Sequence, residues 1–167
     1  MARYQVDQTA TQVVSLARSS IHDTRTVWNK IAGTIEADVD SIAGATAKLT
    51  VDMRAFDAGD FLKNRKLKKD LEVARYPEAQ FELSGLDDIE RKAEGSFEAT
   101  ARGVIRWRGR AVDIAATGKG TLSGSSLEAT ASFDLDVTHL GIAPPKFLMF
   151  KVEKVVTVEV TLRATAC

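Results

Sequence analysis

The sequence predicts an all-β protein: an extended antiparallel barrel of about eight strands, with one helix inserted around residues 60–74. Three observations support this prediction. Apolar and polar residues alternate over most of the chain, which is typical of half-buried strands. Short turns separate the alternating segments, with no crossover helices that would make the sheet parallel. One segment alone, rich in Lys, Arg and Leu, has the pattern of a helix.

The alternating segments are the expected strands. The clearest are residues 47–55 and 127–137, where apolar residues occupy every second position. Residues 96–107 and 111–122 flank an Arg108-Gly109-Arg110 turn and are expected to form a hairpin. The other expected strands cover residues 11–21, 30–39, 79–85 and 156–164. Nothing divides the chain, so residues 1–167 are expected to form a single domain.

The strand at residues 11–21 can be read in two registers. One register places Val14 and Leu16 on the inner face and carries Arg18 with them. The other register places the opposite set inward, namely Val13, Ala17 and Ile21. We adopt the first register, in which Arg18 faces the interior.

The expected helix precedes a Tyr-Pro pair. Gly59-Asp60 can cap its first turn, and Leu67 and Leu71 share one face at i,i+4 spacing. Pro77 fixes its own φ and biases Tyr76 toward extended backbone, so a helix does not easily run through this pair. We expect Tyr76 to lie at the rim of the barrel, where it sets the angle between the helix and the next strand.

A long antiparallel sheet with one apolar face must bury that face, and one helix cannot cover it. The sheet is therefore expected to close as a barrel or to split into a sandwich. An eight-stranded barrel has an interior that side chains just fill or that holds one small ligand. Many inner positions carry Ala or Gly, which leaves room for a guest in a barrel and allows close packing in a sandwich. The residue pattern alone leaves both outcomes open.

If the barrel holds a ligand, the inner faces of the strands form the pore. An apolar lining favours an apolar guest, because each buried methylene contributes about 0.8 kcal/mol. Arg18 is then the candidate partner for the polar end of the ligand. The expected pore-lining residues are Leu16, Arg18, Ile35, Leu49, Val51, Met53, Phe81, Leu83, Phe97, Ile105, Trp107, Ile114, Phe133 and Leu135.

An unusual apolar run follows two prolines near the end of the chain. It contains Phe147, Met149 and Phe150. One interpretation is that this run forms the rim of a portal, where it contacts a lipid tail or a membrane surface. The other is a loop that folds back and plugs one end of the barrel, which avoids an exposed apolar patch.

Composition limits the partners. The chain carries 23 basic and 23 acidic residues. Balanced charge argues against a partner held mainly by electrostatic attraction, so nucleic acid is not expected as a ligand. The single cysteine, Cys167, excludes an internal disulfide. The first residues lack the apolar stretch of a secretory signal, so we expect a cytoplasmic protein, or a periplasmic one if a leader has been removed.

The motifs of common catalytic sites are not found. His22 and His139 are the only histidines, and neither stands in a cluster of metal-ligand spacing. The sequence has no glycine-rich phosphate loop and no Gly-x-Ser-x-Gly nucleophile turn. We therefore expect no metal site, no catalytic residues, no required cofactor and no enzymatic activity.

Three segments together resemble the YceI-like family. They are "LKKDLEVARYPEAQFELSG", "GVIRWRGRAVDI" and "FDLDVTHLGI". The residues that match the family pattern are Tyr76, Pro77 and Phe81, then Gly103, Ile105 and Gly109, and finally Leu140-Gly141. Their order and spacing carry the resemblance, which covers nearly the whole chain. In the first strand this sequence has Leu16 and Arg18-Ser19-Ser20 where the family often has an aromatic residue and a histidine.

The resemblance implies a lipocalin-like barrel whose pore holds a long isoprenoid chain, such as a polyprenyl pyrophosphate or an isoprenoid quinone. It implies a carrier or sequestering protein rather than an enzyme, with a hydrophobic small molecule as its partner. A transient membrane contact and a homodimer are both compatible with this interpretation. The alternative is a filled barrel that serves as a stress-response or protein-interaction module.

Overall fold

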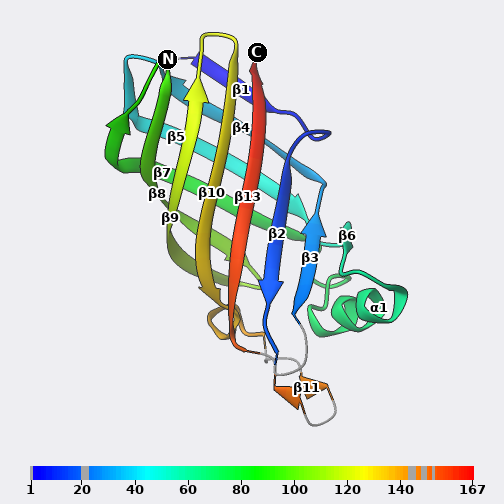
Figure 1. Cartoon of the computed structure of the whole chain (residues 1–167). Coiled ribbons are helices and arrows are strands. Elements are labelled where there is room, and N and C mark those ends of the chain that lie inside the picture. The colour runs from blue at the N-terminus through cyan, green and yellow to red at the C-terminus, as the bar shows by residue number, and fades with distance from the viewer. Residues whose placement is uncertain (1, 20–22, 143–145, 148–149, 152) are drawn as a thin grey trace.

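The computed structural model describes residues 2–19, 23–142, 146–147, 150–151 and 153–167. Eight antiparallel strands form a closed barrel (Figure 1). Around the ring they are β1 (Ala2–Val6), β4 (Ile31–Asp38), β5 (Ser41–Asp52), β7 (Glu78–Arg91), β8 (Ser96–Trp107), β9 (Arg110–Leu122), β10 (Ser126–Asp136) and β13 (Val155–Ala166). The barrel closes where β1 pairs with β13, with Tyr4 opposite Ala166. The predicted fold class is confirmed.

The end of the barrel away from the chain termini carries three further strands (Figure 1). These are β2 (Gln12–Ala17), β3 (Thr24–Trp28) and β6 (Phe56–Asp57). The strand β13 divides one edge between two partners: its last residues pair with β1 and its first residues pair with β2. The strand predicted over residues 11–21 is therefore β2, which lies outside the closed ring. Strand β1 occupies the position in the ring that was predicted for residues 11–21.

The α-helix α1 (Phe61–Asp70) lies beside β3 and β6 at this same end (Figure 1). The Asp60 carboxylate caps it by accepting a hydrogen bond from the Lys63 backbone N–H at 2.8 Å. The helix is shorter than the predicted range of 60–74, because Glu72 adopts a left-handed φ of 52° and turns the chain. That turn buries Leu71 and Val73 against the barrel.

Two clusters of buried side chains lie at opposite ends of the barrel. The first surrounds Tyr4, which is fully buried and donates a hydrogen bond from its hydroxyl to the Ser123 carbonyl oxygen at 2.7 Å. The second lies near α1 and the short 3-10 helix η1 (Val137–Leu140). It consists of Trp28, Met53, Leu71, Val73, Trp107, Leu140 and Ile142. Buried apolar side chains therefore pack at both ends of the barrel.

Two very short strands, β11 (Lys146–Phe147) and β12 (Phe150–Lys151), pair with each other. The expected rim residues Phe147, Met149 and Phe150 fall in this region, where Met149 and the side chains of both phenylalanines lie outside the described part. Whether this run surrounds a portal or plugs the barrel stays a prediction. Within the described residues, no helix is long and apolar enough to cross a membrane.

Candidate functional site: a cavity inside the barrel

A cavity of about 650 Å³ occupies the interior of the barrel. Seven of the eight barrel strands contribute to its wall, and β2, β3 and α1 complete it. The wall is predominantly apolar. Its size lies within the range of natural ligand pockets, about 300–1,000 Å³. The centre of the barrel is therefore not packed solid, and the two-layer sandwich that the residue pattern left open is excluded.

Twelve of the fourteen residues expected to line the pore lie on this wall. Most of them are half-buried, because one side of each apolar side chain faces the cavity. Their contact with a ligand stays a prediction. The twelve are Ile35, Leu49, Val51, Met53, Phe81, Leu83, Phe97, Ile105, Trp107, Ile114, Phe133 and Leu135.

The two exceptions are Leu16 and Arg18, and the register adopted for this strand was wrong. Strand β13 sets the true register, because its wall residue Val158 pairs with Ser15 and its outward Thr157 pairs with Leu16. Leu16 therefore points away from the cavity, and Arg18 is exposed. The residues that face the cavity are Val13, Ser15, Ala17 and Ser19.

Small residues leave the space that the cavity occupies. Ala101 on β8 lies opposite Ala116 on β9, and both lie on the wall. Further wall positions with small side chains are Ala99, Gly118, Ala129 and Ala131. Gly103 does not add to this space, because the Phe81 ring covers it: a Cβ at Gly103 would lie 2.7 Å from that ring. The glycine permits close packing there rather than open space.

The cavity reaches the surface beside α1. Leu62 lies on the wall and is also 74% exposed, so the wall continues onto the outside of the protein at this helix. We call this opening the mouth. Its polar and charged residues are Ser19, Thr24, Asp60, Lys63, Lys66, Asp70 and Glu153. None of them was expected to line the pore, although the i,i+4 spacing of Leu67 and Leu71 already indicated which side of α1 faces the barrel.

Charges at the mouth are partly paired. The Lys66 ammonium lies 3.0 Å from the Asp70 carboxylate, one helical turn along α1. Lys63 is half-buried at the mouth, and its backbone N–H is held by the Asp60 cap. The cavity therefore combines an apolar interior with a charged opening, which suits a molecule with a long apolar tail and a polar head.

Two tryptophans on the wall differ in their hydrogen bonding. The Trp107 indole N–H donates to the Tyr76 carbonyl oxygen at 2.9 Å. Trp28 is 7% exposed, and its indole N–H is buried without a hydrogen-bond partner among the described residues. Its ring packs against Phe56, with 5.8 Å between the ring centroids. A buried donor without a partner costs about 1–3 kcal/mol, so the Trp28 indole is a polar group held in an unfavourable position on the cavity wall.

Arg108 connects the segments around the end of the barrel near α1. Its guanidinium donates to the Leu71 carbonyl oxygen at 2.7 Å and to the Leu140 carbonyl oxygen at 3.1 Å. It also pairs with Glu72 at 2.9 Å and lies over the Tyr76 ring, 4.9 Å from its centroid. The Arg108 side chain is only 11% exposed, so most of its surface is in contact with these segments rather than with solvent.

Tyr76 packs against the second cluster, at the end of the barrel near α1, and it is not a residue of the cavity wall. Its ring is half-buried between the guanidinium groups of Arg75 and Arg108, and its carbonyl oxygen is held by Trp107. The next residue, Pro77, accepts a hydrogen bond from the Met53 backbone N–H at 2.8 Å. The Tyr-Pro pair therefore joins the chain after α1 to the barrel.

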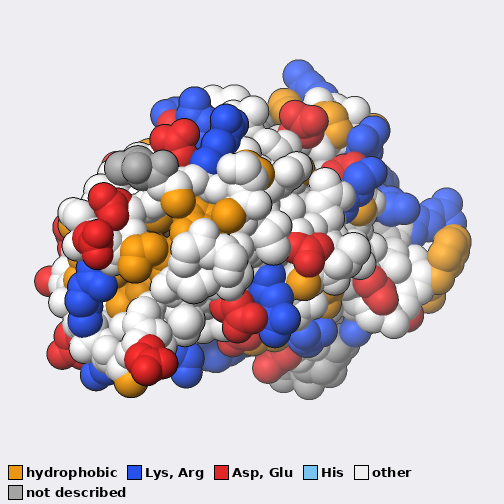
Figure 2. Space-filling model, turned by 90° about the horizontal axis from the view of Figure 1, so that it is seen from above, with side chains coloured by type: hydrophobic (Ala, Val, Ile, Leu, Met, Phe, Trp, Pro, Cys, Tyr) orange, Lys and Arg blue, Asp and Glu red, His pale blue; other side chains and the backbone are white. Residues whose placement is uncertain are grey.

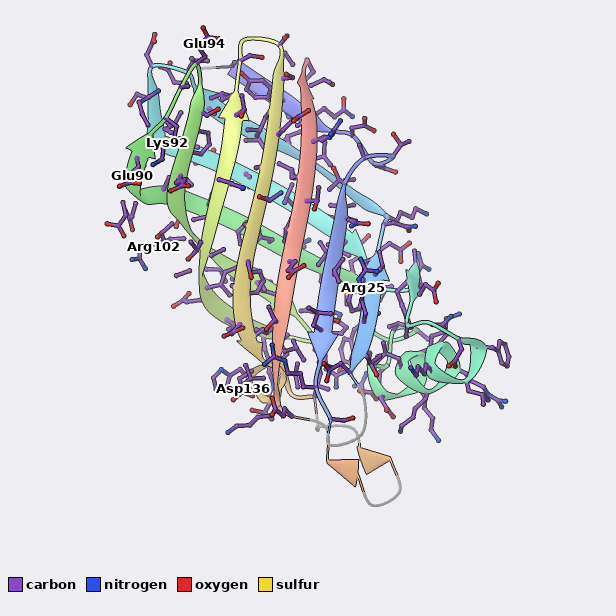
Figure 3. All side chains as sticks on the ribbon, viewed as in Figure 1. Arg25, Glu90, Lys92, Glu94, Arg102 and Asp136 are labelled. Carbon is purple, nitrogen blue, oxygen red and sulfur yellow. The ribbon has the colours of Figure 1, made fainter. Side chains whose placement is uncertain are left out.

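One carboxylate close to the second cluster has a perturbed pKa. Asp136 caps η1, and its pKa is lowered mainly by a hydrogen bond from the Thr138 hydroxyl, and further by the Thr138 backbone N–H, His139 and Lys154. Figure 3 shows Asp136 at the end of the barrel nearest η1. No group of three or more His, Cys, Asp or Glu side chains that could hold a metal ion occurs within the described ranges.

The sequence matches the model of the YceI-like domain over residues 4–164. The chain belongs to the YceI-like family. The sequence has no match among curated proteins. Among solved structures, BcnA of Burkholderia cenocepacia superposes with a TM-score of 0.78 at 19% identity, covering 96% of this chain and 99% of that one.

Two further structures share this fold. A polyisoprenoid binding domain from Saccharophagus degradans, implicated in plant cell wall breakdown, gives a TM-score of 0.77 at 16% identity, with both chains covered in full. The YceI protein of Campylobacter jejuni gives a TM-score of 0.69 at 12% identity, covering 87% of this chain and 86% of that one. At such low identities, these neighbours establish the fold of this YceI-like protein.

Proposed function

We propose that this protein binds a long-chain apolar lipid of the polyisoprenoid class in the barrel cavity and carries or sequesters it. The observation that best supports the proposal is the apolar cavity of about 650 Å³ inside the barrel, which opens beside α1. Burial of apolar surface supplies the affinity, at about 0.8 kcal/mol for each methylene removed from water. The polyisoprenoid binding domain with the same fold supports this ligand class.

The mouth beside α1 orients the ligand. The apolar tail enters the barrel, and a polar head such as a pyrophosphate or a quinone ring stays near the opening. Lys63 and Lys66 lie there with Asp60 and Asp70, so the polar end meets charged side chains and water rather than the apolar wall. Arg18 is not part of this arrangement, because it does not face the cavity.

Organic extraction of the purified protein, followed by mass spectrometry, tests the proposal. The extract is expected to contain a prenyl lipid, and protein stripped of lipid is expected to take up an added prenyl quinone or polyprenyl pyrophosphate. A clean extract, combined with no uptake of either added lipid, would contradict the proposal. That result would favour the alternative of a protein-interaction module whose cavity has no lipid ligand.

A further inference from the structure

The helix α1 has an exposed face that joins apolar and cationic side chains. Phe61 is 76% exposed and Leu62 is 74% exposed, about twice the exposed fraction of the next large hydrophobic side chains, Val39 and Val155, among the described residues. The other exposed residues of α1 are cations. We define the outward face of α1 as Phe61, Leu62, Arg65, Lys68 and Lys69.

Helical periodicity separates this face from the side that packs on the barrel. Phe61, Arg65 and Lys68 follow each other at i, i+4 and i+7 and therefore form one stripe along the helix. Leu67, on the opposite side, is half-buried and lies on the cavity wall. Figure 3 shows side chains of α1 extending away from the barrel. The apolar residues of the outward face are thus not part of the core.

The charge of α1 differs from that of the whole chain. The protein carries equal numbers of basic and acidic residues, whereas the ten residues of α1 include five Lys or Arg and one Asp. That aspartate, Asp70, is half-buried, lies on the cavity wall and pairs with Lys66, so the outward face has no acidic residue. In Figure 2, hydrophobic side chains with Lys and Arg beside them mark the end of the molecule where α1 lies.

We propose that the outward face of α1 docks on the surface of an anionic lipid bilayer. A helix on a bilayer surface buries its large apolar side chains at the boundary of headgroups and acyl chains, which relieves the exposure of Phe61 and Leu62 to water. Arg65, Lys68 and Lys69 then meet anionic headgroups, and each such cation strengthens binding about fivefold. Both interactions come from one face, so they act together.

The position of the mouth favours a bilayer over other occupants. Leu62 belongs both to the outward face and to the cavity wall, so docking through this face brings the cavity opening to the lipid surface. This point alone rests on the proposed function: a polyisoprenoid resides in a bilayer and can enter the cavity from it. A second copy of the chain is disfavoured, because two outward faces carry like charges and repel each other.

Co-sedimentation with lipid vesicles tests the docking of the full chain. Wild-type protein is expected to bind vesicles of equal parts phosphatidylcholine and phosphatidylglycerol, and to bind vesicles of phosphatidylcholine alone far more weakly. High salt is expected to weaken binding to the anionic vesicles, because salt screens charges at the surface. These vesicles contain no prenyl lipid, so the measurement does not depend on the cavity ligand.

Two pairs of matched variants locate the docking face. Lys69→Gln is expected to weaken binding about fivefold, whereas Lys48→Gln, at an exposed lysine on β5, is expected to leave it unchanged. Phe61→Ser is expected to weaken binding about tenfold or more, whereas Val39→Ser is expected to have no effect. Unchanged unfolding curves confirm that the variants are folded.

The outcomes separate docking from ligand binding. Failure of the wild-type protein to bind anionic vesicles would overturn the docking proposal and leave the outward face as a surface for a protein partner. Equal effects of Lys69→Gln and Lys48→Gln would also overturn it. Uptake of a prenyl lipid from detergent micelles, measured separately, tests the proposed function. Uptake without vesicle binding would refute only the docking proposal. Vesicle binding without uptake would refute only the proposed lipid ligand.

Discussion

The Arg108 guanidinium donates a hydrogen bond of 2.7 Å to the carbonyl oxygen of Leu71, at the end of α1. Leu71 is the residue that ends the helix, so its carbonyl has no helical partner of its own. The same guanidinium holds the Leu140 carbonyl oxygen of η1. One side chain, in the turn between β8 and β9, thus fixes α1 and η1 relative to the barrel.

Arg108→Ala is expected to lower the free energy of unfolding by about 3 kcal/mol, because it leaves two buried carbonyl oxygens without their charged donor. Urea denaturation measures this change. Arg106→Ala, on β8 two residues before Arg108, is the matched control. The Arg106 side chain is 50% exposed and lies 3.9 Å from Glu82, so its removal is expected to cost less than about 1 kcal/mol. Equal losses for the two variants would contradict the role assigned to Arg108.

Ala101→Phe is expected to fill part of the cavity and to weaken binding of a prenyl lipid. The new ring would occupy space that the ligand needs, and exclusion of two methylenes reduces affinity roughly tenfold. Binding to lipid-free protein can be followed with a fluorescent prenyl probe. Ala115→Phe places the same ring on the outer face of β9, beside Arg102, and is expected to bind the probe as the wild type does. Equal affinities of both variants would place the ligand outside the barrel.

The comparison of sequence and structure explains why most of the cavity wall could be predicted. Along β10, apolar and polar residues alternate without interruption, and along β8 and β9 the outer face departs from the alternation only at Val104, Ala111 and Ala115, so the inner face follows from period-two patterning. Phe133 and Leu135 on β10, and Ile105 and Trp107 on β8, were assigned to the wall in this way and lie on it.

The short strands contain too few residues for period-two patterning to identify their inner face. Strand β1 has five residues, and the fully buried Tyr4 at its centre was not recognised as part of the barrel. In β2 the inner face contains Ser15, so the more hydrophobic Val14 and Leu16 suggested the opposite register. Pairing with β13 determines that register, and such a long-range contact is not visible in local sequence.

Trp28→Phe is expected to change the free energy of unfolding by less than about 1 kcal/mol. It removes a buried N–H that has no partner in the part of the chain that the structure describes, which offsets the packing lost with the smaller ring. Trp107→Phe is the matched control, because it makes the same change of ring on the same wall. It removes the donor to the Tyr76 carbonyl oxygen and is expected to lower the free energy of unfolding by about 1–2 kcal/mol more than Trp28→Phe does. A larger loss for Trp28→Phe in urea denaturation would show that its indole N–H is satisfied.

Acid is expected to destabilise the protein partly through Asp136. The pKa of this carboxyl is lowered in the folded protein, first of all by the Thr138 hydroxyl, then by the Thr138 backbone N–H and the nearby His139 and Lys154. A lowered pKa means that the folded state binds the proton less readily than the unfolded state. The stabilisation is therefore fully present above the ordinary aspartate pKa of 3.8 and is lost as the pH falls through the lower folded value.

Asp136→Asn removes this titrating group and should flatten the acid dependence of stability. Urea denaturation at neutral pH and at about pH 3 measures the effect: the variant should be less stable than the wild type at neutral pH, and the difference should shrink in acid. Thr138→Val removes the hydroxyl that has the largest influence on Asp136, so it should reduce the acid dependence in the same direction. Because the two side chains share a hydrogen bond, the double variant should lose less stability than the sum of the single losses. A difference between Asp136→Asn and the wild type that is the same at both pH values would show that Asp136 stabilises η1 without a change in its ionisation.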